Sequence, residues 1–146
     1  MSGSQSALQP HPDPGSAEFL GMLGKYPGRS PGMGGPRVQH NVFFAMKADK
    51  SEVVEWFEKT LKPSVQKLSG VIAWNYGPYD SFEGFNKGFN WGMSFTFKDQ
   101  YSRDVWIAHR EHEAGIGALM PMLENGPDSV LAFDHLLPEQ DLVSTD

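Results

Sequence analysis

The amino-acid sequence predicts an α+β domain in which four antiparallel strands form one sheet and helices cover one of its faces. Four segments have the alternating or short aromatic pattern of β-strands. Two segments with apolar residues at helical spacing separate the first strand from the second and the third from the fourth. The order strand, helix, strand, strand, helix, strand is the split βαβ arrangement of ferredoxin-like domains, and it occupies residues 38–137.

Composition limits the classes of function. The chain has 146 residues, which is room for one domain, and its net charge of −6 argues against nucleic acid and anionic membrane surfaces as partners. Cysteine is absent, which excludes disulfides and thiolate chemistry. No apolar run reaches the roughly 20 residues that span a bilayer, and the N-terminal segment lacks a secretory signal pattern. A cytoplasmic protein is therefore expected.

The two ends of the chain differ from its middle. Residues 1–37 hold more than half of the eleven prolines together with many glycines and serines. Such a composition buries too little apolar surface to offset chain ordering, so this tail is predicted to be disordered. Residues 138–146 form a second tail that is polar and acidic.

The first strand is predicted to begin at Val38, and its alternation places His40 on the more apolar side. A helix follows, capped by Asp49 or Ser51. Pro63 lies within this helix and is expected to kink or break it.

The second strand is predicted over Val71 to Tyr76 and a connecting loop over Gly77 to Lys87. The third strand then has the most regular alternation in the chain, with large apolar residues on one side and small or polar ones on the other. The two sides are Phe89, Trp91, Met93, Phe95 and Phe97, and Gly88, Asn90, Gly92, Ser94 and Thr96. We expect the large side to pack under the helices and the small side to let another chain or a ligand approach closely.

A helix capped by Asp99 is predicted next, and the spacing places His109 and His112 on its inward side. Asn125-Gly126-Pro127 is expected to end the helical region, and the fourth strand is predicted over Ser129 to Leu137. A sheet covered on one face leaves the other bare. Two such faces can bury each other, so a homodimer is expected.

Several segments give the chain a family resemblance. The segments that carry the resemblance are VQHNVFFAMK, GFNWGMSFTF, HREH and LAFDH. They occur in the order found in the stress-responsive dimeric A/B barrel (Dabb) family, which the chain resembles over residues 38–137. The resemblance implies a homodimeric α+β barrel that works without a cofactor. Family members include plant stress proteins and a cyclase that closes a polyketide by aldol condensation. The histidines of the cyclase's first strand and helix fall on His40 and His112, whereas its second-strand histidine and helix tyrosine fall on Trp91 and Trp106.

His40 and His112 are the candidate catalytic pair. An imidazole titrates near neutral pH, so one ring can take a proton next to a carbonyl while the other stabilises the developing oxyanion. The alternative is that each is a buried histidine satisfied by a backbone carbonyl or a carboxylate. The expected ligand is a small apolar metabolite that bears a carbonyl and is polyketide-like. The candidate substrate-binding residues are Trp74, Tyr76, Phe89, Trp91, Phe95, Trp106 and His109.

Other functions remain open. His109 and His112 stand near Glu111 and Glu113, but these glutamates point elsewhere on the helical wheel, so no metal is expected. A non-catalytic stress-responsive barrel that acts through oligomerisation or ligand binding is one alternative, and a cofactor-free oxygenase is another. A cavity of roughly a few hundred Å³ that both candidate histidines face favours catalysis, whereas indoles that fill this space favour a structural role.

Overall fold

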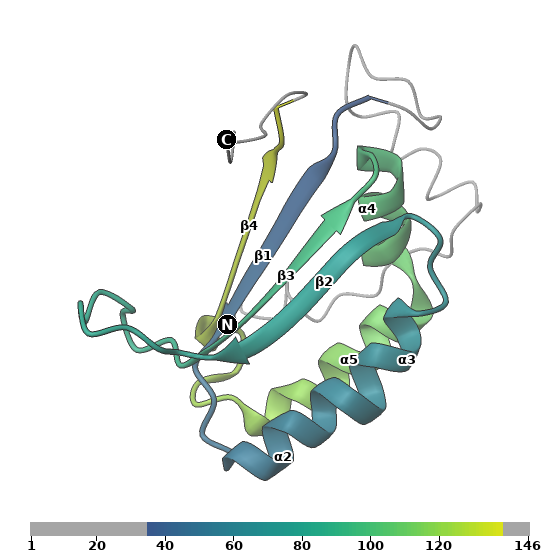
Figure 1. Cartoon of the computed structure of the whole chain (residues 1–146). Helices are drawn as coiled ribbons and strands as arrows, with labels where there is room; N and C mark the ends of the chain where they lie inside the picture. The colour runs from purple at the N-terminus through teal and green to yellow at the C-terminus, as the bar shows by residue number, and fades with distance from the viewer. Residues whose placement is uncertain (1–34, 139–146) are drawn as a thin grey trace, which may run out of the picture.

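The computed structural model of the chain describes residues 35–138. Within this part, four strands form one antiparallel sheet in the order β2-β3-β1-β4. Their bounds are β1 (Val38–Phe44), β2 (Val71–Pro78), β3 (Trp91–Phe97) and β4 (Val130–Leu136). The helices lie on one side of this sheet and leave its other face open (Figure 1). The predicted ferredoxin-like fold class is confirmed.

The first helical segment is continuous but not uniform. It consists of α2 (Lys50–Glu55), the π-helix η2 (Trp56–Leu61) and α3 (Lys62–Val65). The carboxylate of Asp49 caps it by accepting the N–H of Glu52 at 3.0 Å. The predicted interruption near Pro63 takes the form of a π turn rather than a break. A proline has no N–H and crowds the carbonyl four residues earlier, and the wider turn relieves both conflicts.

The second helical segment differs from its prediction. The sequence pattern indicates one helix through both histidines, but the structure has α4 (Gln100–Ala108) and α5 (Arg110–Leu119). His109 stands between them with extended backbone, at φ −74° and ψ 141°, and caps α4. The prediction of a single helix was wrong here, because the break resets the helical phase between His109 and His112. Two short 3₁₀ helices follow, η3 (Met120–Met122) and η4 (Gly126–Ser129).

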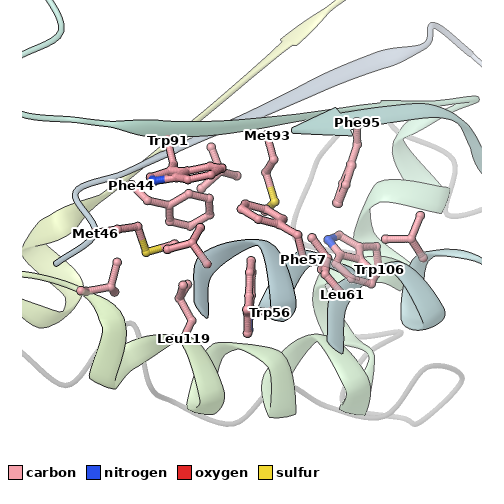
Figure 2. Packing of buried hydrophobic residues seen from close by; sticks show 14 of the residues in the cluster. Phe44, Met46, Trp56, Phe57, Leu61, Trp91, Met93, Phe95, Trp106 and Leu119 are labelled. Atoms are coloured by element: carbon pink, nitrogen blue, oxygen red, sulfur yellow. The ribbon is translucent and has the colours of Figure 1, made fainter. Parts of the chain in front are cut away.

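The large side of β3 forms much of the core. Figure 2 shows Trp91, Met93 and Phe95 projecting from the sheet toward the helices, which supply Trp56, Phe57, Leu61 and Leu119. Phe95 and Phe97 are fully buried. The small residues of the strand lie on the open face instead. The predicted orientation of β3 is therefore confirmed.

Phe89 is the exception, because β3 begins at Trp91 rather than at Gly88. The side chain of Asn90 bonds to the backbone of Met46, accepting its N–H at 2.8 Å and donating to its carbonyl at 2.9 Å. Lys87 and Gly88 have positive φ angles of 54° and 85°. The chain therefore still turns at this point, and Phe89 belongs to the loop before the strand.

The predicted tails, residues 1–37 and 138–146, lie almost entirely outside the described residues. Between residues 35 and 138, no helix has both the length and the apolar character needed to cross a membrane.

Candidate functional site

A cavity of about 240 Å³ lies between the sheet and the helices. Strands β1, β3 and β4 line one side of it, and η2, α4 and α5 line the other. Most of the lining is apolar, including Val42, Met93 and Leu119. Two histidine rings, His40 from β1 and His112 from α5, also line it. The two candidate catalytic residues therefore border the same cavity.

His40 is held by a carboxylate on the neighbouring strand. It lies opposite Asp134 in the β1/β4 register, and its Nδ1 is 2.5 Å from Asp134 Oδ1. The other carboxylate oxygen of Asp134 accepts a hydrogen bond from Arg103 Nη1 at 2.9 Å. Arg103 in turn donates from Nε to Asp104 at 2.6 Å. A buried histidine is thus tied through Asp134 to a guanidinium on α4.

The charges of this network set the state of Asp134. Partial burial alone would raise its pKa, but the hydrogen bonds and charges of His40 and Arg103 outweigh burial and hold the pKa below its ordinary value of 3.8. An ionised carboxylate only accepts hydrogen bonds. The proton of a neutral His40 ring must therefore lie on Nδ1, which leaves Nε2 as the basic nitrogen.

Trp106 also lines the cavity and carries a further polar group, its indole N–H. Its side chain is 1% exposed, and its ring meets the rings of Phe95 and His112 edge to face at 5.4 Å and 5.1 Å. Among the residues that the structure describes, its indole N–H has no hydrogen-bond partner. A buried donor without a partner costs about 1–3 kcal/mol, so an acceptor atom within the cavity would stabilise it.

Other indole and phenol groups are already engaged. The N–H of Trp56, which also lines the cavity, donates to the carbonyl of Gly115 at 3.1 Å. The phenol of Tyr76 donates to Glu58 at 2.6 Å, and this bond raises the pKa of Tyr76 to about 12. Its ring stacks on Phe57, with centroids 4.1 Å apart. Tyr76 is not among the residues that line the cavity.

The remaining candidate substrate-binding residues also lie outside this cavity. Trp74 is on the edge strand β2, and its ring centroid lies 5.7 Å from that of Tyr76 and 6.0 Å from that of Phe95. Phe95 is a fully buried core residue. His109 is half-buried in the connection between α4 and α5. Of the predicted site residues, the cavity thus brings together His40, His112 and Trp106.

Trp91 and Phe89 line a different pocket. It has a volume of about 390 Å³ and lies where the loop between β2 and β3 meets the open face. We call it the loop pocket, and its lining includes Phe43, Tyr79, Phe85 and Leu131 besides these two residues. Trp91 therefore does not fill the space between His40 and His112.

Two residues of the site were not predicted from the sequence, Asp134 and Arg103. Asp134 is the one acidic residue in the segment LAFDHLL, whose other residues are apolar except for His135, and that pattern was the available signal. Its pairing with His40 depends on the β1/β4 register, which spans about ninety residues of chain. Its neighbour His135 points to the opposite side of β4 and is exposed.

No protein-family model matches the sequence, and no curated protein matches it. Solved structures do share its fold. A dimeric ferredoxin-like protein of unknown function from a Jannaschia species has a TM-score of 0.62 and 24% identity, covering 68% of this chain and 97% of that one. Hydroxynitrile lyase from Passiflora edulis has a TM-score of 0.61 and 13% identity, covering 73% and 98%.

A Dabb family protein with a ferredoxin-like fold from Mesorhizobium loti also aligns. Its TM-score is 0.57 and its identity 20%, covering 73% of this chain and 100% of that one. At these identities the likeness concerns the fold. The chain therefore has the ferredoxin-like fold found in a Dabb family protein, and the resemblance drawn from its sequence is confirmed at the level of the fold.

Proposed function

We propose that this protein is a cofactor-independent enzyme of the cyclase or lyase type, in which His40 is the general base and His112 its acid partner. The observation that carries the proposal is the bond from His40 Nδ1 to Asp134 on the wall of an apolar cavity. A carboxylate that holds one ring nitrogen orients the imidazole and stabilises its protonated form. The same cavity is lined by His112, which can donate to a developing oxyanion.

The reaction begins with removal of a proton from carbon next to a carbonyl. His40 Nε2 takes the proton, and the electron pair of the C–H bond moves onto the carbonyl oxygen as an enolate. His112 and the indole N–H of Trp106 are the donors that stabilise this oxygen. The enolate carbon then attacks a second carbonyl in a cyclisation, and the proton returns from His40 to the new alkoxide.

The cavity limits the substrate to a small molecule. Its volume of about 240 Å³ suits a ligand of small-molecule size. The side chains around it, such as Val42, Met93 and Leu119, favour an alkyl or aromatic body. Among the described residues that line the cavity, His40, His112 and Trp106 carry polar groups that could orient a carbonyl, because the indole N–H of Trp56 is already bonded to Gly115. We therefore favour a short polyketide-like or other apolar carbonyl metabolite.

The proposed active form is a homodimer. The open sheet face exposes large apolar side chains, including Phe43 at 41%, Leu131 at 47% and Phe133 at 62%. A contiguous apolar patch of this kind is typical of an interface. The Jannaschia protein of the same fold is described as dimeric, and the Passiflora protein is a lyase, so this fold is compatible with both parts of the proposal.

Proton exchange provides the most direct test because it does not require the natural substrate. We expect the protein to catalyse exchange of the α-protons of 2-hexanone for deuterium in D₂O, followed by NMR. His40→Gln keeps hydrogen-bonding capacity but cannot shuttle a proton, so it should lower this rate by about 10²–10⁴-fold. The melting temperature should change little.

Glu55→Gln is the control, because Glu55 is exposed on α2 and lies away from both the cavity lining and the open face. It should leave the exchange rate unchanged. If wild-type protein gives no exchange above buffer, or if both variants lose the same activity, the acid/base proposal fails. A non-catalytic barrel that binds a ligand or assembles through its open face would then be favoured.

A further inference from the structure

The loop that joins β2 to β3 displays aromatic side chains that its own domain does not cover. Phe82 is 100% exposed and Phe85 is 74% exposed. Single exposed apolar residues are ordinary, but these two belong to one loop, and Phe85 lies beside the apolar end of the open face. The loop pocket joins Phe85 to Phe43 and Leu131 of the sheet. Loop and sheet thus form one apolar surface that no other part of the described chain covers.

Hydrogen bonds hold this loop in shape. The N–H of Tyr79 donates to the carbonyl of Asn90 at 2.8 Å, and the N–H of Gly84 donates to the hydroxyl of Tyr79 at 3.3 Å. Asn86 and Phe89 exchange two bonds, at 2.9 Å and 2.8 Å. Because these bonds already fix the backbone that presents the aromatic rings, little further ordering is needed when another surface covers them.

Polar side chains at the centre of the open face, on β1 and β3, already hydrogen-bond to one another. Thr96 donates to the side-chain carbonyl of Gln39 at 2.8 Å, and Ser94 donates to that of Asn41 at 3.0 Å. The amide of Gln39 donates to Ser94 in turn. These polar groups therefore satisfy one another within the face. A polar strip that is satisfied in this way can lie under a second sheet at little cost.

We propose that a second copy of this chain covers this surface, with Phe82 and Phe85 packing on the partner's open face next to its loop pocket. We call this contact the loop clamp; it rests on the homodimer of the proposed function. An interface between identical copies uses the same patch twice, and this patch offers both projecting rings and a pocket of about 390 Å³. The net charge of −6 disfavours an anionic membrane as the occupant.

The first test measures the dimer dissociation constant by sedimentation equilibrium. The double variant Phe82→Ser, Phe85→Ser should weaken the dimer by about tenfold or more, because aromatic side chains contribute heavily to interfaces. Both side chains are exposed in one chain, so the variant should fold, and circular dichroism checks this. Ile72→Ser is the control, since Ile72 is 54% exposed but lies at the far end of β2 from the loop. It should change the constant by less than about twofold.

The second test locates the contact. Because the chain has no cysteine, Phe82→Cys gives a single attachment point for a solvent-sensitive fluorophore, and Glu55→Cys on α2 gives a control. Dilution through the dissociation constant should shift the emission of the probe at position 82 to the red and leave that at position 55 unchanged. A wild-type protein that is monomeric throughout would overturn the homodimer and the clamp together. A wild-type dimer with an unchanged double variant and an unresponsive probe would overturn the loop clamp alone.

Discussion

His40 shows how one buried residue is compatible with two interpretations. The centroid of its ring lies 5.7 Å from that of Phe95 and 6.1 Å from that of Phe97, and its Nδ1 is bonded to Asp134. A carboxylate partner is what a purely structural buried histidine needs, and it is also what orients a general base. The cavity beside His40 favours the second interpretation, because a core histidine needs no cavity next to it.

The pH dependence of stability should report the network of Asp134. Because its pKa is lowered in the folded protein, its contribution is present above the ordinary value of 3.8 and is lost as the pH falls through the folded pKa. Asp134→Asn should therefore lower the free energy of unfolding by about 1–3 kcal/mol at pH 7 and by less at pH 3. Urea unfolding at both pH values measures this.

Asp128→Asn, at an exposed position in η4, is the control for that experiment. It should change stability little at either pH. An equal loss for Asp134→Asn at pH 7 and pH 3 would show that the effect comes from packing rather than from the charge of Asp134.

Phe95 provides a residue-scale test of the core. It is fully buried and contacts the rings of His40, Trp74, Phe97 and Trp106. Phe95→Ala should cost about 3–5 kcal/mol in the free energy of unfolding, because it leaves a cavity among these rings. Phe85→Ala, at a position 74% exposed, should cost less than about 1 kcal/mol in the monomer. Chemical denaturation at low protein concentration compares the two.

At the scale of elements, local patterns predicted the strands better than the helices. The alternation predicted for β3 is present in the structure, because one side of the strand faces the helices and the other side belongs to the open face. The break at His109 had no local signal, since neither proline nor glycine is near it. The cavity is lined by Trp106 of α4 and by His112 of α5. The break at His109 therefore lets two separate helices each place a side chain in the same cavity. That requirement is tertiary and is not visible in helical spacing.

The cap of α4 should contribute more to the free energy of unfolding than the cap of α2. Asp99 is 2% exposed and accepts both the N–H and the hydroxyl of Ser102, at 2.8 Å and 2.7 Å. Asp99→Ala should lower the free energy of unfolding by about 2–4 kcal/mol, because it removes a helix cap and leaves the buried hydroxyl of Ser102 without this acceptor. Asp49→Ala removes an exposed cap and should cost about 0.5–1 kcal/mol. Equal losses in thermal or chemical unfolding would contradict this ranking.

At the scale of the whole molecule, the order of elements was enough to predict the sheet and its open face. The site needed more, because His40, Trp106, Asp134 and His112 come from four different elements. Period-two and helical patterns identify which side of an element faces the core, but not which residues meet across it. His40 and His112 could be paired from the family resemblance, whereas the bond to Asp134 required the register of two strands distant in sequence.

The open face provides the last prediction. Phe133 lies on β4 and is 62% exposed in one chain, so replacing it by Asp should leave the monomer folded with nearly the same melting temperature. In the proposed dimer the same carboxylate would be buried against the partner's sheet without a matching cation, which is strongly unfavourable. Phe133→Asp should therefore weaken the dimer by about 100-fold or more in sedimentation velocity experiments. Ile72→Asp introduces the same charge at a position 54% exposed and away from the apolar end, so it should weaken the dimer far less. If both variants remain as dimeric as wild type, the two copies meet through a surface other than the open face.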